Sequence, residues 1–191
     1  MKSQGMIAVK MLLAFTILTG ILYPLMITGL AQLIFPHQAN GSLVKKDGRL
    51  LGSELIGQKT DSSIYFWPRP SATDYNTLPS GGSNLGPTSE KLKNLAEKRR
   101  KAFVFGNNLR TNTVVPAEMV FASASGLDPH ISPRAALLQM DRIAAARSFS
   151  KQQKRQLEEL ILKKTELPQF SLLGEARVNV FMLNLALDKT P

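Results

Sequence analysis

The sequence predicts an α/β protein, in which a single N-terminal transmembrane helix is followed by one compact α+β soluble domain. The first observation is that residues 11–35 carry no charged side chain. At about 1.5 Å per residue, a helix of that length exceeds the ~30 Å hydrocarbon core of a bilayer. The second is that residues 36–191 mix short apolar segments with polar turns and can bury a core of their own. We therefore expect an N-terminal tail at 1–10, a transmembrane helix at 11–35 and a soluble α/β domain at 36–191.

The apolar segment has one alternative interpretation, a cleavable signal peptide. Small residues at Gly29-Leu30-Ala31 offer a cleavage site. However, the apolar segment is longer than the ~7–15 residues of a signal core and continues past that site. We favour a retained membrane anchor.

Small or polar residues recur at every fourth position of the span. They are Thr16, Gly20, Pro24, Thr28 and Gln32. Successive members turn by about 40° around a helix, so they form a slanting stripe. Small residues let two helices approach closely, and hydroxyl or amide groups can form hydrogen bonds between them. We expect the stripe to face another helix, the alternative being that such residues are simply frequent in membrane helices.

The charge distribution bears on orientation and on partners. Lys2 and Lys10 precede the span, and basic residues also follow it, so the positive-inside rule only slightly favours a cytoplasmic N-terminus and an extracytoplasmic domain. The formal net charge of +10 fits an acidic partner or anionic lipid. The basic residues are scattered, and we expect no nucleic-acid binding.

The chain has no cysteine, which excludes disulfides and thiolate chemistry.

Turn and cap signals place the elements of the domain. Asp47-Gly48 between two short apolar runs predicts a β-hairpin. Residues 58–87 hold four prolines and several aromatic residues without clear periodicity, which predicts an ordered irregular segment used for function or docking. Thr88 or Ser89 begins a helix to about Val104, with Leu92, Leu95, Ala96 and Phe103 on its buried side.

The C-terminal half is predicted to be mainly helical. The β-branched, apolar residues 114–122 predict a strand. One helix begins at Ser132-Pro133 and another at Ser150. Residues 178–185 fit a helix with Val178, Phe181, Met182 and Leu185 on one face, although the Val-Asn-Val start leaves a strand open.

A glycine-rich segment directly precedes the first helix of the domain. Its candidate nucleotide-binding residues are Ser80, Gly81, Gly82, Ser83 and Asn84. Glycines allow close backbone approach, and free amides at a helix start attract phosphate. The segment lacks the lysine of a P-loop, and a turn with a helix cap is the alternative.

The titratable residues do not form a recognisable catalytic or metal-binding motif. His130 lies in Asp-Pro-His-Ile-Ser just before a predicted helix, where a turn residue is the simplest interpretation. A metal site needs three or four convergent ligands, and no candidate set stands out. We expect no catalytic residue and no metal.

Five motifs carry a resemblance to a known family. They are GSELIGQ at 52–58, YFWPRPSA at 65–72, SGGSNLGPTS at 80–89, SGLDPHISPRAALLQMDRIAAAR at 125–147 and GEARVNVFMLNLALD at 174–188. In this order, and behind an N-terminal span, the chain resembles the C subunit of Kdp-type potassium-transporting P-type ATPases over nearly its whole length.

The resemblance implies a single-pass accessory subunit of an inner-membrane complex that takes up potassium with high affinity. Its partners would be a channel-like potassium-binding subunit, a P-type ATP-hydrolysing subunit, a small peptide subunit and membrane lipid. The subunit would be non-catalytic, would carry no cofactor of its own and would serve assembly. The alternative is a catalytic chaperone that raises the ATP affinity of the ATP-hydrolysing subunit through a shared ATP complex, with Ser80 to Asn84 touching nucleotide.

The aromatic, proline-rich segment is the expected docking surface for the large subunits. Tyr65, Arg69 and Tyr75 are its candidate contacts. The alternative is that Arg69 pairs locally and Tyr75 belongs to the core.

Overall fold

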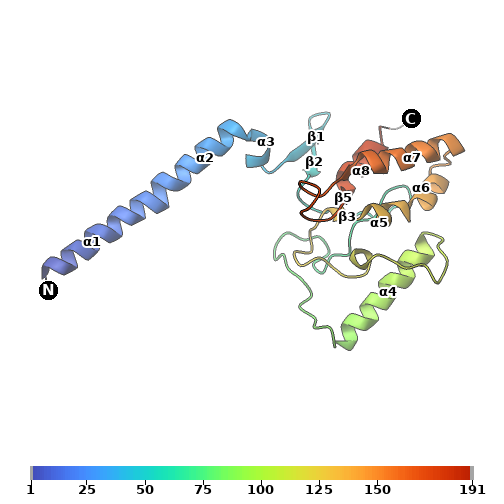
Figure 1. Cartoon of the computed structure of the whole chain (residues 1–191), viewed down its shortest axis with the longest axis horizontal. Coiled ribbons are helices and arrows are strands. Elements are labelled where there is room, and N and C mark those ends of the chain that lie inside the picture. Colours follow the sequence, from blue (N-terminus) through green and yellow to red (C-terminus); the bar gives the residue numbers. More distant parts are fainter. Residues whose placement is uncertain (1, 190–191) are drawn as a thin grey trace. The chain divides into compact units, whose positions relative to one another are not determined.

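The chain divides after Ser53 into two units in the computed structural model, which describes residues 2–189 (Figure 1). The first unit begins with a continuous helical stretch: α1 (Lys2–Ile17), the π-helix η1 (Leu18–Leu22) and α2 (Tyr23–Ile34). Residues Gln4–Ile34 are long and apolar enough to cross a membrane, as predicted. The described part of the expected tail continues the same helix. A short helix α3 (Pro36–Ala39) follows.

The π-helix lies immediately before Pro24. A proline has no amide hydrogen and its ring crowds the carbonyl four residues earlier. In the structure the amide of Tyr23 instead donates to the carbonyl of Leu18, five residues back. The wider turn therefore accommodates Pro24 without breaking the span.

The wider turn also affects the stripe of small residues. Gly20 lies inside η1, so the uniform rotation expected between successive stripe residues does not hold through this turn. The side-chain amide of Gln32 already has a partner within the chain. It donates to the side chain of Asn40 at 3.3 Å and accepts from it at 3.1 Å. Contact of the stripe with another helix stays a prediction.

A β-hairpin completes the first unit. Strands β1 (Leu43–Lys46) and β2 (Arg49–Ser53) pair antiparallel, with a register shift between Val44 and Lys45. Asp47 and Gly48 form the turn with φ angles of 51° and 75°. Two successive positive φ values are the signature of a two-residue hairpin turn, and the predicted hairpin is confirmed.

The second unit combines helices with a small sheet. Its helical elements are α4 (Glu90–Gly106), the 3₁₀-helix η2 (Ala117–Met119), α5 (Pro133–Leu137), α6 (Met140–Ala146), α7 (Lys151–Lys163) and α8 (Val180–Leu187). The strands β3 (His130–Ile131), β4 (Thr165–Glu166) and β5 (Arg177–Asn179) form an antiparallel sheet in the order β3-β5-β4. Val178 pairs with both Ile131 and Thr165, so β5 is the central strand.

Serine caps start the helices where the sequence predicts them. The Ser89 hydroxyl accepts from the amide of Leu92 at 3.3 Å, and Ser132 caps α5 in the same way. Ser150 forms a capping box with Gln153 at the start of α7. The single helix expected from Ser132 onward is divided into α5 and α6.

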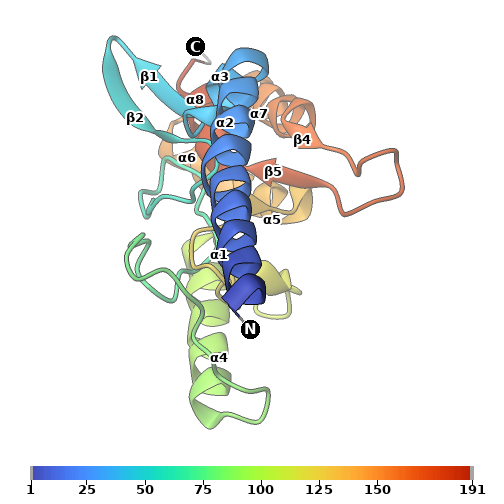
Figure 2. The same cartoon turned by 90° about the vertical axis from the view of Figure 1, so that its left-hand side faces the viewer.

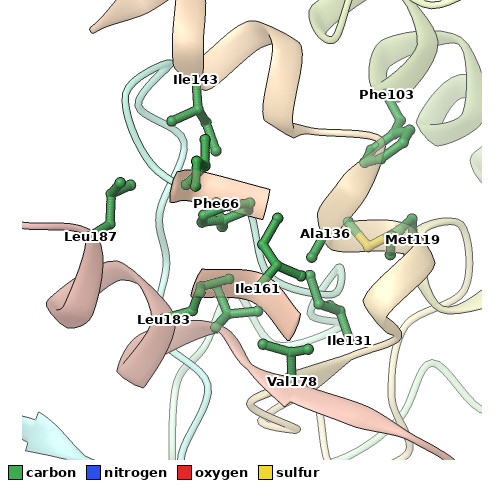
Figure 3. Packing of buried hydrophobic residues seen from close by; sticks show 13 residues of the cluster. Phe66, Phe103, Met119, Ile131, Ala136, Ile143, Ile161, Val178, Leu183 and Leu187 are labelled. Atoms are coloured by element: carbon green, nitrogen blue, oxygen red, sulfur yellow. The ribbon is translucent and has the colours of Figure 1, made fainter. Parts of the chain in front are cut away.

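The hydrophobic core brings together α5 to α8, the sheet, Phe103 of α4, Met119 of η2 and Phe66 of the irregular segment. Figure 3 shows Phe66 close to Ile143 and Leu183, and Val178 close to Ile131. Phe66, Leu183 and Leu187 are fully buried. On α4 only Phe103 and Val104 are buried, whereas Leu92, Leu95 and Ala96 are only partly covered.

Two predictions about these elements are wrong. Residues 114–122 form no strand: Pro116 interrupts the β-branched residues, and Ala117–Met119 form a 3₁₀ turn that inserts Met119 into the core. The second concerns the C-terminus. Both the helix and the strand considered for residues 178–185 are present, because β5 leads directly into α8. The buried face of α8 is Val180, Leu183, Asn184 and Leu187, so the expected face is displaced.

The irregular segment is ordered by side chains, since among the described residues 54–89 the structure has neither helix nor strand. The amide of Asn184 accepts from the Phe66 N–H at 2.8 Å and donates to the Phe66 carbonyl at 3.0 Å. Gln139 does the same for Trp67, at 2.7 and 3.2 Å. Each buried amide therefore replaces the neighbouring strand that this backbone lacks.

We predict that Asn184→Leu destabilises the chain. Leucine has a similar size but leaves both backbone groups of Phe66 buried and unpaired, at a cost of about 1–3 kcal/mol for each group. Guanidinium unfolding of the detergent-solubilised chain, followed by the fluorescence of its single tryptophan, measures the change. Asn94→Leu on the exposed surface of α4 is the control, and equal midpoints for the two variants would contradict the assigned role.

Candidate functional site

A cavity of about 570 Å³ opens on the second unit. Its wall is formed by Arg69 from the irregular segment, Glu118 from η2, the turn that leads into β3, and two parts of the chain after β4, residues 167–169 and 173–177. The turn is fixed in place because the amide of Gly57 donates to the carbonyl of Leu127 at 2.7 Å. Sequence elements far apart in the chain therefore meet at this cavity.

A charged network lies in the cavity wall. Arg69 forms an ion pair with one carboxylate oxygen of Asp128. The other oxygen accepts from the His130 backbone amide at 3.0 Å and lies 3.2 Å from its ring Nδ1. Burial alone raises the pKa of Asp128, but the hydrogen bonds from His130 and Arg69 outweigh it and lower the pKa to about 2. Asp128 is therefore a fixed negative charge at neutral pH.

The side chains expected to contact a partner each form a hydrogen bond or an ion pair within the domain; they are Tyr65, Arg69 and Tyr75. The Tyr65 hydroxyl donates to Asp188 at 2.9 Å, and the Tyr75 hydroxyl donates to the carbonyl of Arg69. Burial raises the pKa of Tyr75 to about 12. The local pairing of Arg69 matches the alternative interpretation, whereas Tyr75 is only partly buried and lies outside the core cluster. Contact of these residues with another subunit stays a prediction.

A second network, centred on Arg142, supports the irregular segment. The guanidinium of Arg142 lies 3.9 Å from the centroid of the Trp67 ring and donates to Asn107 at 2.9 Å and to Gln139 at 3.0 Å. Burial lowers its pKa to about 10. The Trp67 ring also touches Gly106 of α4, where a Cβ would come within 2.6 Å of a ring atom. Trp67 therefore contacts both a buried arginine and a glycine whose small size makes room for the ring.

Sequence reasoning missed these buried polar residues although a signal was present. Gln139 lies three residues after Ala136 and four before Ile143, on the apolar stripe of its region. Asn184 occupies the corresponding stripe on α8. A polar residue on an otherwise buried face signals a satisfied internal hydrogen bond.

The glycine-rich segment does not form the cap of α4. Ser89 provides that cap, and Ser80 to Asn84 precede it. Gly82 packs against the carbonyl of Ala124, while Ser83 and Asn84 are exposed. Nucleotide contact through this segment stays a prediction.

The cavity wall combines charged and apolar side chains. Within residues 2–189 no group of three or more His, Asp or Glu side chains is placed to hold a metal ion. Arg69 and Asp128 neutralise each other, and Leu167, Pro168 and Leu173 form an apolar part of the wall beside the polar Gln169.

Comparison with known proteins gives the family. Residues 6–189 match the family described as K+-transporting ATPase, c chain. A relative from Methylococcus capsulatus is 51% identical over 95% of both chains, and its name is potassium-transporting ATPase KdpC subunit. Proteins with the same name from Mycobacterium tuberculosis and Photorhabdus laumondii are 48% and 49% identical, covering 99% and 96% of this chain and 100% and 95% of their own.

We predict that Asp128→Asn weakens the fold in a pH-dependent way. The folded-state pKa of about 2 lies below the ordinary value of 3.8, so the carboxylate stabilises the fold above pH ~4 and loses this effect as the pH falls through 2. The variant should be less stable than wild type at pH 7, with the difference vanishing between about pH 4 and 2. Urea unfolding across this range tests it.

Glu159→Gln is the control for that measurement, because Glu159 is an exposed carboxylate of α7. A stability difference for Asp128→Asn that is unchanged from pH 7 to pH 2 would contradict the role of its charge.

Proposed function

The chain belongs to the family of the c chain of K+-transporting ATPases, and from this we propose that it is a non-catalytic accessory subunit needed to assemble a high-affinity potassium-uptake complex. Its partners are a channel-like potassium-binding subunit, a P-type ATP-hydrolysing subunit and a small peptide subunit. The observation that carries the proposal is the match over residues 6–189, which includes both the membrane span and the domain.

The use of the polar residues supports an assembly role. Several charged side chains form hydrogen bonds that hold the domain together, among them Arg69, Arg142 and Asp188. A residue whose hydrogen bonds maintain the fold is poorly placed to change partners during a reaction cycle. The domain is thereby suited to be a rigid support for larger subunits.

The proposed location is the cell inner membrane, with a cytoplasmic N-terminus and an extracytoplasmic domain. ATP is cytoplasmic, so a domain across the membrane would support the potassium-binding subunit and would not contact nucleotide. A basic domain repels potassium, but screening over ~8 Å at physiological salt limits this effect. The basic surface is better matched to acidic loops of a partner or to lipid headgroups.

The second candidate function is a catalytic chaperone acting in the cytoplasm. The exposure of Ser83 and Asn84 favours it, because these residues are accessible to a ligand. In this case the subunit would raise the ATP affinity of the ATP-hydrolysing subunit through a shared ATP complex.

We predict that omission of the chain separates the potassium-binding and ATP-hydrolysing subunits. Gly20→Leu should have the same effect by blocking the close approach of a partner helix. Within the chain nothing lies within 4 Å of a Cβ at Gly20, so the leucine fits the isolated helix. Co-purification from detergent-solubilised membranes and the KM for ATP are the measurements.

The two candidate functions give different results in that experiment. Loss of co-purification supports assembly, whereas an intact complex with a raised KM for ATP supports the chaperone. Leu33→Ala is a matched control, because Leu33 is a highly exposed residue of the same helix outside the stripe. Co-purification of Gly20→Leu at the wild-type level would contradict the proposed contact of the stripe.

We predict that Ser83→Cys is labelled by a membrane-impermeant thiol reagent in intact cells. The natural chain has no cysteine, so there is no background, and Ser83 is exposed. Gln4→Cys, at the N-terminal end of the span, should be labelled only after lysis. Labelling of Ser83→Cys only after lysis would place the domain beside cytoplasmic ATP and would favour the chaperone.

A further inference from the structure

The loop between β4 and β5 exposes four large apolar side chains. The exposed fractions are 74% for Leu167, 92% for Phe170, 81% for Leu172 and 59% for Leu173. Residues 167–174 carry no charge. In Figure 2 the loop projects beyond the ends of the two strands. Single exposed apolar residues are common, but a cluster of this kind on one projecting loop marks an interaction surface.

The backbone of the loop is closed by its own hydrogen bonds. The amides of Gln169 and Leu173 each donate to the other's carbonyl at 2.9 Å, and the amides of Ser171 and Leu172 donate to Pro168 and Gln169 at 3.0 and 3.1 Å. Such internal pairing is what a backbone needs where water is scarce, as at a lipid surface.

The apolar side chains divide into two sets. Leu167 and Leu173 line the cavity beside Arg69, together with Pro168 and Gln169. Phe170 and Leu172 do not line it and are the two most exposed of the four. Phe170 and Leu172 are therefore the side chains available to a surface outside the domain.

We propose that Phe170 and Leu172 insert into the interfacial region of the bilayer that anchors the chain. Residues 35–53 separate the span from the second unit, and even fully extended they reach only about 65 Å. The start of the second unit therefore always stays within that distance of the membrane surface. Two apolar side chains bind a membrane weakly on their own, but tethering makes the contact intramolecular.

Positive charge near the base of the loop is suited to a surface that contains anionic lipid. Lys163 and Lys164, at the end of α7, are exposed. Arg177 is neutralised by Glu166 at 2.9 Å, and Glu175 lies on the cavity side of the loop. The lysines are therefore placed to meet anionic headgroups beside the inserted residues.

The inference goes beyond the proposed function, because it concerns lipid and needs no other subunit. The test uses the full chain alone in vesicles of phosphatidylcholine and phosphatidylglycerol. Nitroxides are attached to Phe170→Cys and, separately, to Leu172→Cys, in a chain with no natural cysteine. Collision with oxygen, which concentrates in lipid, is compared with collision with a water-soluble nickel chelate present on both sides.

Labels at positions 170 and 172 should show an oxygen-to-nickel accessibility ratio several-fold higher than a label at Phe105→Cys. Phe105 is the matched control, since it is an 87% exposed phenylalanine of α4. Equal ratios at 105, 170 and 172 would overturn the proposal. A change at 170 and 172 that appears only after the other subunits are added would also overturn it and would assign the loop to a protein interface.

Discussion

The second unit depends on the pairing of two side-chain amides with an extended backbone that has no strand beside it. Asn184 holds both polar groups of Phe66, and Gln139 holds both polar groups of Trp67. Buried backbone groups must be paired, and these four bonds allow an irregular segment to cross the interior. They also attach the segment to α8 and to the start of α6, so that Phe66 can enter the core.

The same constraint explains a buried arginine that has no carboxylate partner among residues 2–189. Arg142 is 6% exposed, and its charge is stabilised by backbone carbonyls, two amides and the face of Trp67. A guanidinium suits this position because it is planar, donates in several directions and is more weakly hydrated than an ammonium. Through Asn107 the contact reaches the end of α4, so one side chain connects three parts of the domain.

Local signals predicted the elements that depend on local chemistry. The uncharged span, the Asp47-Gly48 turn and the caps at Ser89, Ser132 and Ser150 each act within a few residues, and the structure contains all of them.

The predictions that are wrong concern residues whose structure is determined by contacts with parts of the chain that are distant in sequence. Residues 114–122 were expected to form a strand, but no strand edge is provided for them and Met119 is buried by a 3₁₀ turn. The face of α8 was misplaced because Asn184 is buried by pairing with a residue far away in sequence. The cavity around Arg69 and Asp128 joins separate segments in the same way, and no local pattern encodes it.

These hydrogen bonds within the domain limit which of its surfaces can contact other molecules. If the hydroxyl of Tyr65 or Tyr75 donated to another protein, it would lose its bond to Asp188 or to the backbone carbonyl of Arg69. Surfaces with no such cost are the partly covered apolar side of the first half of α4 and the exposed loop between β4 and β5. Because most polar side chains at the centre of the domain are paired within it, the most favourable contacts with other molecules are expected at its periphery.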